Sequence, residues 1–241
     1  MREWGRTTAA LALAAALAAC SGGTGGIERE EDGGVSAIQV ASLLNQALRQ
    51  RQAEPEPFSL TREQLAAARF TQPLLVARLE SGVTAGLTPA ASNRGFITWQ
   101  TQDGIALIGR GDVLAGTRGL GADLLSAETE PVLLALAAGR SDLYRRTLRR
   151  LDGEGRILVQ DYACELALGP AETVVVLGRA HATRRSTESC QPVSEPDAET
   201  PAAYRAEPFV NTYNVGDGTI WRSRQWVGPA LGHIVLERVI E

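Results

Sequence analysis

The segment Trp221–Trp226, which reads Trp-Arg-Ser-Arg-Gln-Trp, is the densest aromatic stretch of the sequence and a candidate binding segment. On a β-strand, alternation places its odd-numbered residues on one face and its even-numbered residues on the other. Indole faces stack on sugar rings, and arginines hydrogen-bond hydroxyls and carboxylates. Because tryptophan is also a common core residue, at least one of the two indoles is expected inside the protein. The candidate contacts for a glycan or a protein partner are Arg118, Trp221, Arg222, Arg224, Gln225 and Trp226.

A second group of cations lies earlier in the chain, at Arg145, Arg146, Arg149 and Arg150. Guanidinium groups pair bidentately with carboxylates and phosphates, so this cluster could bind an acidic sugar or a phospholipid headgroup. Several acids are close to it in the sequence, and a solvated strand or turn with local ion pairs explains the same pattern. Both interpretations stay open at this point.

Several kinds of catalysis are excluded by the residues that the chain lacks or holds in small numbers. It has no lysine, which removes Schiff-base chemistry and phosphate-loop binding by that residue. The only histidines, His181 and His233, are too few for a three-histidine metal site, and no Gly-x-Ser-x-Gly turn accompanies them. We therefore expect no metal, no cofactor and no enzyme activity. A periplasmic glycan-active enzyme with paired carboxylates is the alternative, because the 28 acids offer many pairs.

The formal net charge of −4, with no strongly basic domain, argues against nucleic acid as a partner. The first residues instead indicate export. A basic start is followed by the apolar run Thr7–Ala19, which is short for a membrane span and ends in Leu-Ala-Ala before Cys20. This pattern resembles the bacterial lipobox, in which the chain is cut before the cysteine and the thiol is alkylated with diacylglycerol. An ordinary secretory cleavage site, with a cysteine there by chance, is the alternative.

We accordingly predict a signal peptide over residues 1–19 and a lipid anchor, with palmitate-type acyl chains, on Cys20. Residues 20–35 are rich in glycine, serine and acids and are typical of a flexible tether. By resemblance to other lipoproteins, Ser21 after the cysteine favours sorting to the outer membrane, on its periplasmic face. Three acyl chains hold a protein on a membrane firmly, whereas one does not.

Two cysteines remain, Cys164 and Cys190, 26 residues apart. In an oxidising compartment such an isolated pair favours a disulfide bond, and two buried free thiols are the alternative. Closing this loop would stabilise the fold by about 3–4 kcal/mol on the loop-entropy model.

Residues 36–241 are predicted to form a single mainly β domain, a barrel or sandwich of antiparallel strands with short helices near the N-terminus and in mid-chain. Apolar spacing predicts helices over Ser36–Gln50, Arg62–Arg69 and Ala127–Ala138. A hairpin turn is expected at Gly169-Pro170 and a surface loop over Gln191–Ala206. The predicted strands are Leu74–Glu80, Val83–Leu87, Phe96–Thr101, Ile105–Gly109, Val113–Thr117, Asp142–Leu151, Ile157–Leu168, Glu172–Arg179, Phe209–Val215, Gly218–Val227 and His233–Val239.

From about Leu74 to the C-terminus the chain resembles the YjbF/GfcB family of lipoproteins, which is associated with group 4 capsule and exopolysaccharide production. The likeness is carried by the lipobox ending at Cys20 and by Trp99, Val113–Leu125, Cys164, Thr183–Cys190 and Trp221–Pro229. It implies an outer-membrane lipoprotein with a mainly β fold that acts in polysaccharide secretion or assembly, alongside other secretion proteins. It transfers no active site, and Cys20 is the one residue whose role it supplies.

Overall fold

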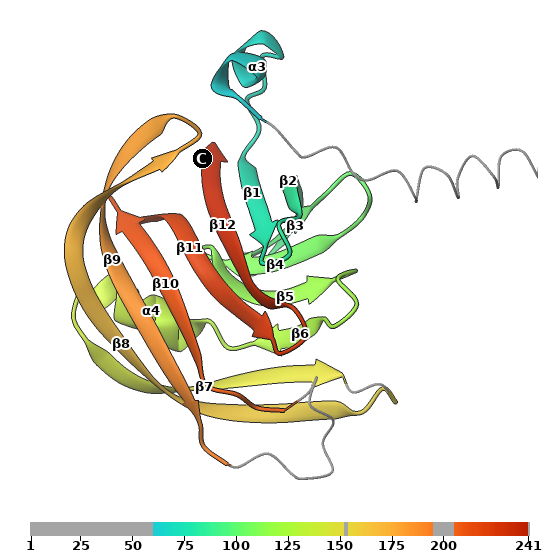
Figure 1. Cartoon of the computed structure of the whole chain (residues 1–241), viewed down its shortest axis with the longest axis vertical. Helices are drawn as coiled ribbons and strands as arrows, with labels where there is room; N and C mark the ends of the chain where they lie inside the picture. Colours follow the sequence, from blue (N-terminus) through green and yellow to red (C-terminus); the bar gives the residue numbers. More distant parts are fainter. Residues whose placement is uncertain (1–59, 152–153, 195–204, 241) are drawn as a thin grey trace, which may run out of the picture. The chain divides into compact units, whose positions relative to one another are not determined.

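The computed structural model describes residues 60–151, 154–194 and 205–240, which belong to the unit Pro55–Glu241. The predicted signal peptide, Cys20, the tether and the helix Ser36–Gln50 lie outside these residues. Twelve antiparallel strands form one sheet that curls into a nearly closed barrel, as Figure 1 shows, so the mainly β prediction is confirmed. The two helices within the described residues are α3 (Arg62–Ala67) and α4 (Glu130–Ala138).

The sheet has the strand order β5-β4-β3-β2-β1-β12-β11-β10-β9-β8-β7-β6. Its two edges are therefore β5 and β6, which follow each other in the sequence. The strands are β1 (Leu74–Leu79), β2 (Thr84–Asn93), β3 (Phe96–Gln100), β4 (Ala106–Arg110), β5 (Val113–Arg118), β6 (Leu124–Ala127), β7 (Asp142–Leu151), β8 (Ile157–Val176), β9 (Arg179–Pro192), β10 (Phe209–Gly216), β11 (Thr219–Gly228) and β12 (Gly232–Ile240).

The expected hairpin at Gly169-Pro170 is wrong. Strand β8 runs through these residues, and its register with β9 shifts between Leu168 and Ala171. Proline lacks an N–H but is tolerated at such a bulge, where no ladder hydrogen bond is needed. The true turn is at Leu177-Gly178, and both residues have positive φ. Strand β9, which the sequence does not predict beyond Arg179, therefore pairs with β8 along most of its length. It extends to Pro192, into the expected surface loop.

Helix α4 also begins later than predicted, because Ala127 ends strand β6 and the helix starts at Glu130. The helix packs onto the barrel through Val132 and Ala135, in a cluster that includes Leu166 and Tyr213. At another place α3 contributes Leu65 to a cluster with Val174 and Trp221. The predicted start of α3 is confirmed, since Thr61 and Gln64 form a reciprocal capping box.

Side chains close the sheet where its two edges meet. The β5–β6 connection turns at Gly119 and Gly121, both with positive φ. The carboxylate of Asp123 accepts hydrogen bonds from the Thr117 hydroxyl at 2.7 Å and from the Gly119 N–H at 2.9 Å. The Thr117 hydroxyl in turn accepts the N–H of Leu124 at 2.9 Å. These contacts join β5 to β6, and we call this junction, residues 117–124, the seam.

The predicted disulfide is present between Cys164 of β8 and Cys190 of β9. The two residues are direct cross-strand partners, and both are buried. The bond therefore joins the two longest strands of the sheet from inside the core.

Candidate functional site

A groove of about 690 Å³ lies beside the start of α4. Its walls come from β3, β4, β6, the start of α4 with the connection before it, and β7, so residues more than fifty positions apart meet there. The volume falls within the range of about 300–1,000 Å³ that is usual for small-ligand sites. The lining residues with polar or aromatic groups are Phe96, Arg110, Ser126, Glu128, Thr129, Glu130, Asp142, Tyr144 and Arg149.

Two arginines of the groove are held differently. The guanidinium of Arg110 lies 5.7 Å from the ring centre of Phe96 and 3.8 Å from the Glu130 carboxylate. Arg149 is half-buried on β7, and no hydrogen bond or ion pair is formed by its guanidinium among the residues that the structure describes. Among the described residues, the guanidinium of Arg149 therefore has no partner and is open to a ligand.

The groove carboxylates already have partners close to them in the fold. Glu128 accepts the N–H of Thr147 at 3.2 Å. Asp142 accepts the N–H of Leu143 at 2.9 Å and lies 3.6 Å from the guanidinium of Arg140. The side chain of Glu130 is 71% exposed, and that of Asp142 is 37% exposed. Asp142 and Glu130 each lie near a guanidinium, whereas Glu128 is held by a backbone N–H, which does not neutralise a charge.

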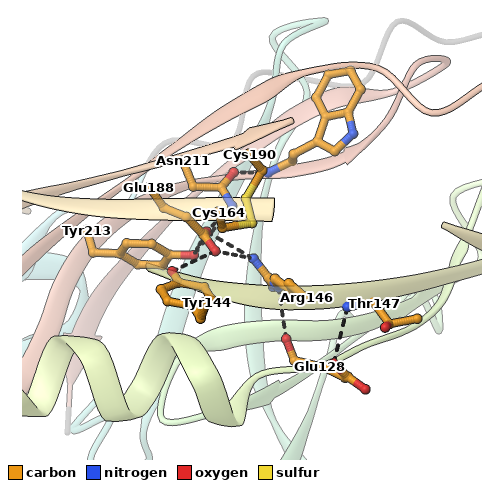
Figure 2. Close-up of a disulfide and its surroundings, with 10 residues drawn as sticks. Glu128, Tyr144, Arg146, Thr147, Cys164, Glu188, Cys190, Asn211 and Tyr213 are labelled. Carbon is orange, nitrogen blue, oxygen red and sulfur yellow. Dashed lines mark hydrogen bonds and ion pairs between the residues drawn. A yellow bond between two sulfur atoms is a disulfide. The ribbon is translucent and has the colours of Figure 1, made fainter. Parts of the chain in front are cut away.

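Behind the groove, the carboxylate of Glu188 is the centre of a buried network of polar side chains (Figure 2). The side chain of Glu188 is fully buried, and its oxygens lie 3.0 and 3.1 Å from one guanidinium nitrogen of Arg146. The same carboxylate accepts hydrogen bonds from the hydroxyls of Tyr144 at 3.0 Å and Tyr213 at 2.9 Å, and from the Asn211 amide at 2.7 Å. These donors replace the water that the buried charge has lost.

The network also positions the groove. Tyr144 lines the groove while its hydroxyl donates to Glu188. The Nε of Arg146 donates to the backbone oxygen of Glu128 at 2.8 Å, a contact visible in Figure 2. Two lining residues, one on β7 and one before α4, are therefore tied to the same buried ion pair.

The disulfide lies next to this carboxylate. Among the described residues, Cys164, Cys190 and Glu188 are the one group of three potential metal ligands whose donor atoms lie within 4.8 Å of one another. The two sulfurs are bonded to each other, and Glu188 is bound to Arg146. This group is therefore a disulfide beside an ion pair and has no donor set to offer a metal.

The arginine cluster that the sequence suggested is divided by strand alternation. Arg146 and Arg150 point inward and are 4% and 3% exposed, whereas Arg145 is exposed and Arg149 faces the groove. Arg150 donates to the side-chain oxygen of Gln160 at 3.1 Å, and burial lowers its pKa to about 10. Neither of the two interpretations describes all four arginines, because two are core residues and one lines a groove.

Both tryptophans of the candidate segment take part in the core. Trp221 is 9% exposed and stacks on His181, with ring centres 3.5 Å apart. Trp226 is half-buried between Phe209 and His233, at ring-centre distances of 6.1 and 5.0 Å. Trp221 is thus the expected core indole, and a sugar-stacking role for Trp221 would require the core to open.

The polar residues of the same segment hold neighbouring strands together. Arg222 donates to the Glu237 carboxylate at 2.7 Å and to the backbone oxygen of Val175 at 2.7 Å, and Arg224 forms an ion pair with Glu80. The buried amide of Gln225 accepts the Leu114 N–H at 2.7 Å and donates to the backbone oxygen of Asp112 at 2.8 Å. These contacts assign structural roles to the three side chains.

Arg118, the remaining candidate, is exposed and bonds backbone oxygens of the seam, including that of Leu124 at 3.2 Å. None of the six candidate contact residues lines the groove. Of the groove residues, only Arg149 belonged to a cluster that the sequence indicated. The others are separated along the chain, and no local pattern marks Phe96, Arg110 or Glu130 as neighbours in space. A binding role for the Trp221–Trp226 segment stays a prediction.

A family model for the group 4 capsule polysaccharide lipoproteins gfcB and YjbF matches residues 41–239. The chain belongs to this family. No curated protein sequence gives a match.

A solved structure similar to this YjbF-family chain is that of the hypothetical lipoprotein YmcC from Escherichia coli (K12). The TM-score is 0.62 at 16% sequence identity, and the match covers 89% of this chain and 98% of the other. At this identity the likeness establishes the fold alone. Within the described residues of the family member, neither helix is long and apolar enough to cross a membrane.

We predict that Glu188→Gln lowers the free energy of unfolding by about 3–5 kcal/mol, because it leaves the buried Arg146 charge without its partner. Chemical denaturation monitored by circular dichroism measures the change. Glu165→Gln is the matched control, since Glu165 is exposed on β8 and should change stability by no more than about 0.5 kcal/mol. Equal stability of the two variants would show that the ion pair is not a main support of the fold.

A second prediction concerns alkaline pH. Burial raises the pKa of Tyr162, and burial together with the Glu188 carboxylate raises the pKa values of Tyr144 and Tyr213. In the unfolded chain these phenols ionise near pH 10, so the stability that they contribute is present below that pH and is lost as the pH rises above it. At about pH 11 the folded protein should show phenolate absorbance from at most two of its four tyrosines, because Tyr144 and Tyr213 stay protonated at that pH. Reversible ionisation of three or more with an unchanged circular dichroism spectrum contradicts this prediction.

The third prediction separates the two indoles. Trp221→Ala should cost about 3–5 kcal/mol of stability, because it empties a packed site in the core. The half-buried Trp226 should tolerate replacement better, so Trp226→Ala can be tested for retention on the producer's own exopolysaccharide. Val175→Ala, at an exposed strand position, serves as the control for both measurements. Retention that is unchanged in a folded Trp226→Ala protein removes this segment as a glycan site.

Proposed function

We propose that the protein is an outer-membrane-anchored periplasmic lipoprotein that takes part in capsule or exopolysaccharide secretion or assembly as a non-catalytic binding or accessory protein. Membership in the group 4 capsule polysaccharide lipoprotein family supports this proposal most directly. The proposed anchor is a lipid on Cys20, which would keep the domain beside the membrane through which the polymer passes. The proposed partners are the polysaccharide itself and other secretion proteins.

The groove is the observation from the geometry that supports a binding role. It combines guanidinium, carboxylate and hydroxyl groups with the rings of Phe96 and Tyr144. Polar groups of both kinds hydrogen-bond the donors and acceptors of sugar hydroxyls, and aromatic rings pack on the apolar faces of sugars. Its walls rest on strands and on a buried network, which favours a preformed site over one that must be ordered by the ligand.

A non-catalytic role agrees with the positions of the two histidines. His181 is buried against Trp221, and His233 lies between the Glu80 carboxylate at 3.1 Å and the backbone oxygen of Val210 at 2.8 Å. Neither histidine lines the groove. The alternative function, a glycan-active enzyme with paired carboxylates, rests on Glu128, Glu130 and Asp142, which all line the groove.

Export of the polymer tests the proposal. In a producing strain that lacks this chain, cell-surface polysaccharide should fall, and expression of the wild-type chain should restore it. Cys20→Ser should remove fatty-acid labelling and leave export low, because the domain is no longer held at the membrane. Ser21→Ala is the control, since it leaves the thiol in place.

Two results would overturn parts of this proposal. Undiminished export without the chain contradicts a role in secretion, and full labelling of Cys20→Ser contradicts the anchor. The enzyme alternative predicts shorter polysaccharide chains after incubation with the purified protein. That shortening should disappear in Glu130→Gln or Asp142→Asn, whereas a binding protein leaves the chain length unchanged.

A further inference from the structure

We propose that the groove beside α4 recognises an acidic polysaccharide, and that Arg149 binds an oxyanion carried on a sugar, such as a carboxylate or a phosphate. This inference rests on the proposed function and names the ligand class of the same site. Arg149 is its specificity-determining residue.

The position of Arg149 in the sheet carries the argument. On β7 it pairs with Val159 of β8 on one side and with Ser126 of β6 on the other, and both Arg149 and Ser126 line the groove. The side chain is half-buried, so it is partly removed from water, yet no acid neutralises it among the residues described. An ion pair formed in such a place is weakened less by solvent than one on an open surface. A planar guanidinium also offers two parallel N–H donors, which match the two oxygens of a carboxylate or phosphate.

The acids of the groove do not cancel this cation. Glu128 is bound to the backbone of Thr147, and Asp142 is bound to the backbone of Leu143 and lies close to Arg140. Glu130 lies near Arg110. None of these three acids forms an ion pair with Arg149 among the residues described, so its guanidinium is left for a ligand. The open side of Glu130 is then available for a sugar hydroxyl.

Arg145 supplies a matched comparison on the same strand. It lies four residues before Arg149, so alternation places both on the outward side of β7, and Arg145 is exposed without lining the groove. Replacing either arginine by glutamine removes one positive charge from the same face. If the two variants differ in polymer binding, the cause is the position of Arg149 in the groove and not the net charge of the protein.

The test is affinity electrophoresis of the purified protein in gels that contain polygalacturonate, phosphomannan or neutral dextran. The wild-type protein should be retarded by at least one acidic polymer and not by dextran, and the polymer that acts distinguishes a carboxylate from a phosphate. Arg149→Gln should weaken this binding about tenfold or more, because it removes a charge-assisted bidentate contact, and Arg149→Lys should fall between the two. Arg145→Gln should bind as the wild type does.

Retardation of Arg149→Gln equal to that of the wild type, or equal retardation by dextran, overturns the inference. The export assay with Arg149→Gln distinguishes failure of the acidic-ligand inference from failure of the proposed function. If wild-type and Arg149→Gln chains restore export equally, the secretion role stands and the acidic-ligand inference falls. If the wild-type chain itself does not affect export, the proposed function falls. Thermal unfolding of each variant verifies that the variant is folded, so that weaker binding is not caused by unfolding.

Discussion

The buried ion pair between Arg146 and Glu188 is the constraint on which the arrangement of this barrel depends. A carboxylate that is fully buried is tolerable only when donors surround it, and here the donors come from β7 and β10 toward a residue of β9. The other nitrogens of Arg146 reach the backbone oxygens of Glu128 and Leu114, before α4 and on β5. One charge pair thus fixes five separate parts of the fold. The neighbouring disulfide holds β8 and β9 together at the same level of the core.

This constraint explains how the sheet can close with two unpaired edges. At Leu114, on the edge strand β5, side chains from other strands bind both backbone groups. Gln225 of β11 binds the N–H of Leu114, and Arg146 of β7 binds its oxygen at 3.4 Å. Leaving such buried groups without partners would destabilise the fold by about 1–3 kcal/mol each. The β6–α4 connection, held by the same Arg146, forms one wall of the groove, so the closure of the sheet and the shape of the groove have a common cause.

Much of the fold could be predicted from the sequence because its signals are local. Short apolar runs between turn residues indicate strands, and two cysteines in an exported chain indicate a disulfide. Prediction failed where a local signal was overruled by pairing, as at Pro170, which a bulge accommodates inside β8. Prediction of the site failed for a different reason. Glu188 is 42 residues from Arg146, and the groove brings Phe96 to β7, so no spacing in the sequence reveals either relation.

The segment Trp221–Pro229, which helps to carry the resemblance to the family, has residue types that packing explains. Its indoles pack in the core, and its Gln225 completes the edge of β5. A side chain at Gly228 would meet the buried guanidinium of Arg150, since even a Cβ would lie 2.3 Å from one of its nitrogens. The demands of packing account for these residue types without any ligand. A resemblance carried by this segment is therefore explained by the packing of the barrel. The groove differs in this respect, because it combines exposed residues such as Glu130 with residues such as Tyr144 that are also part of the buried network.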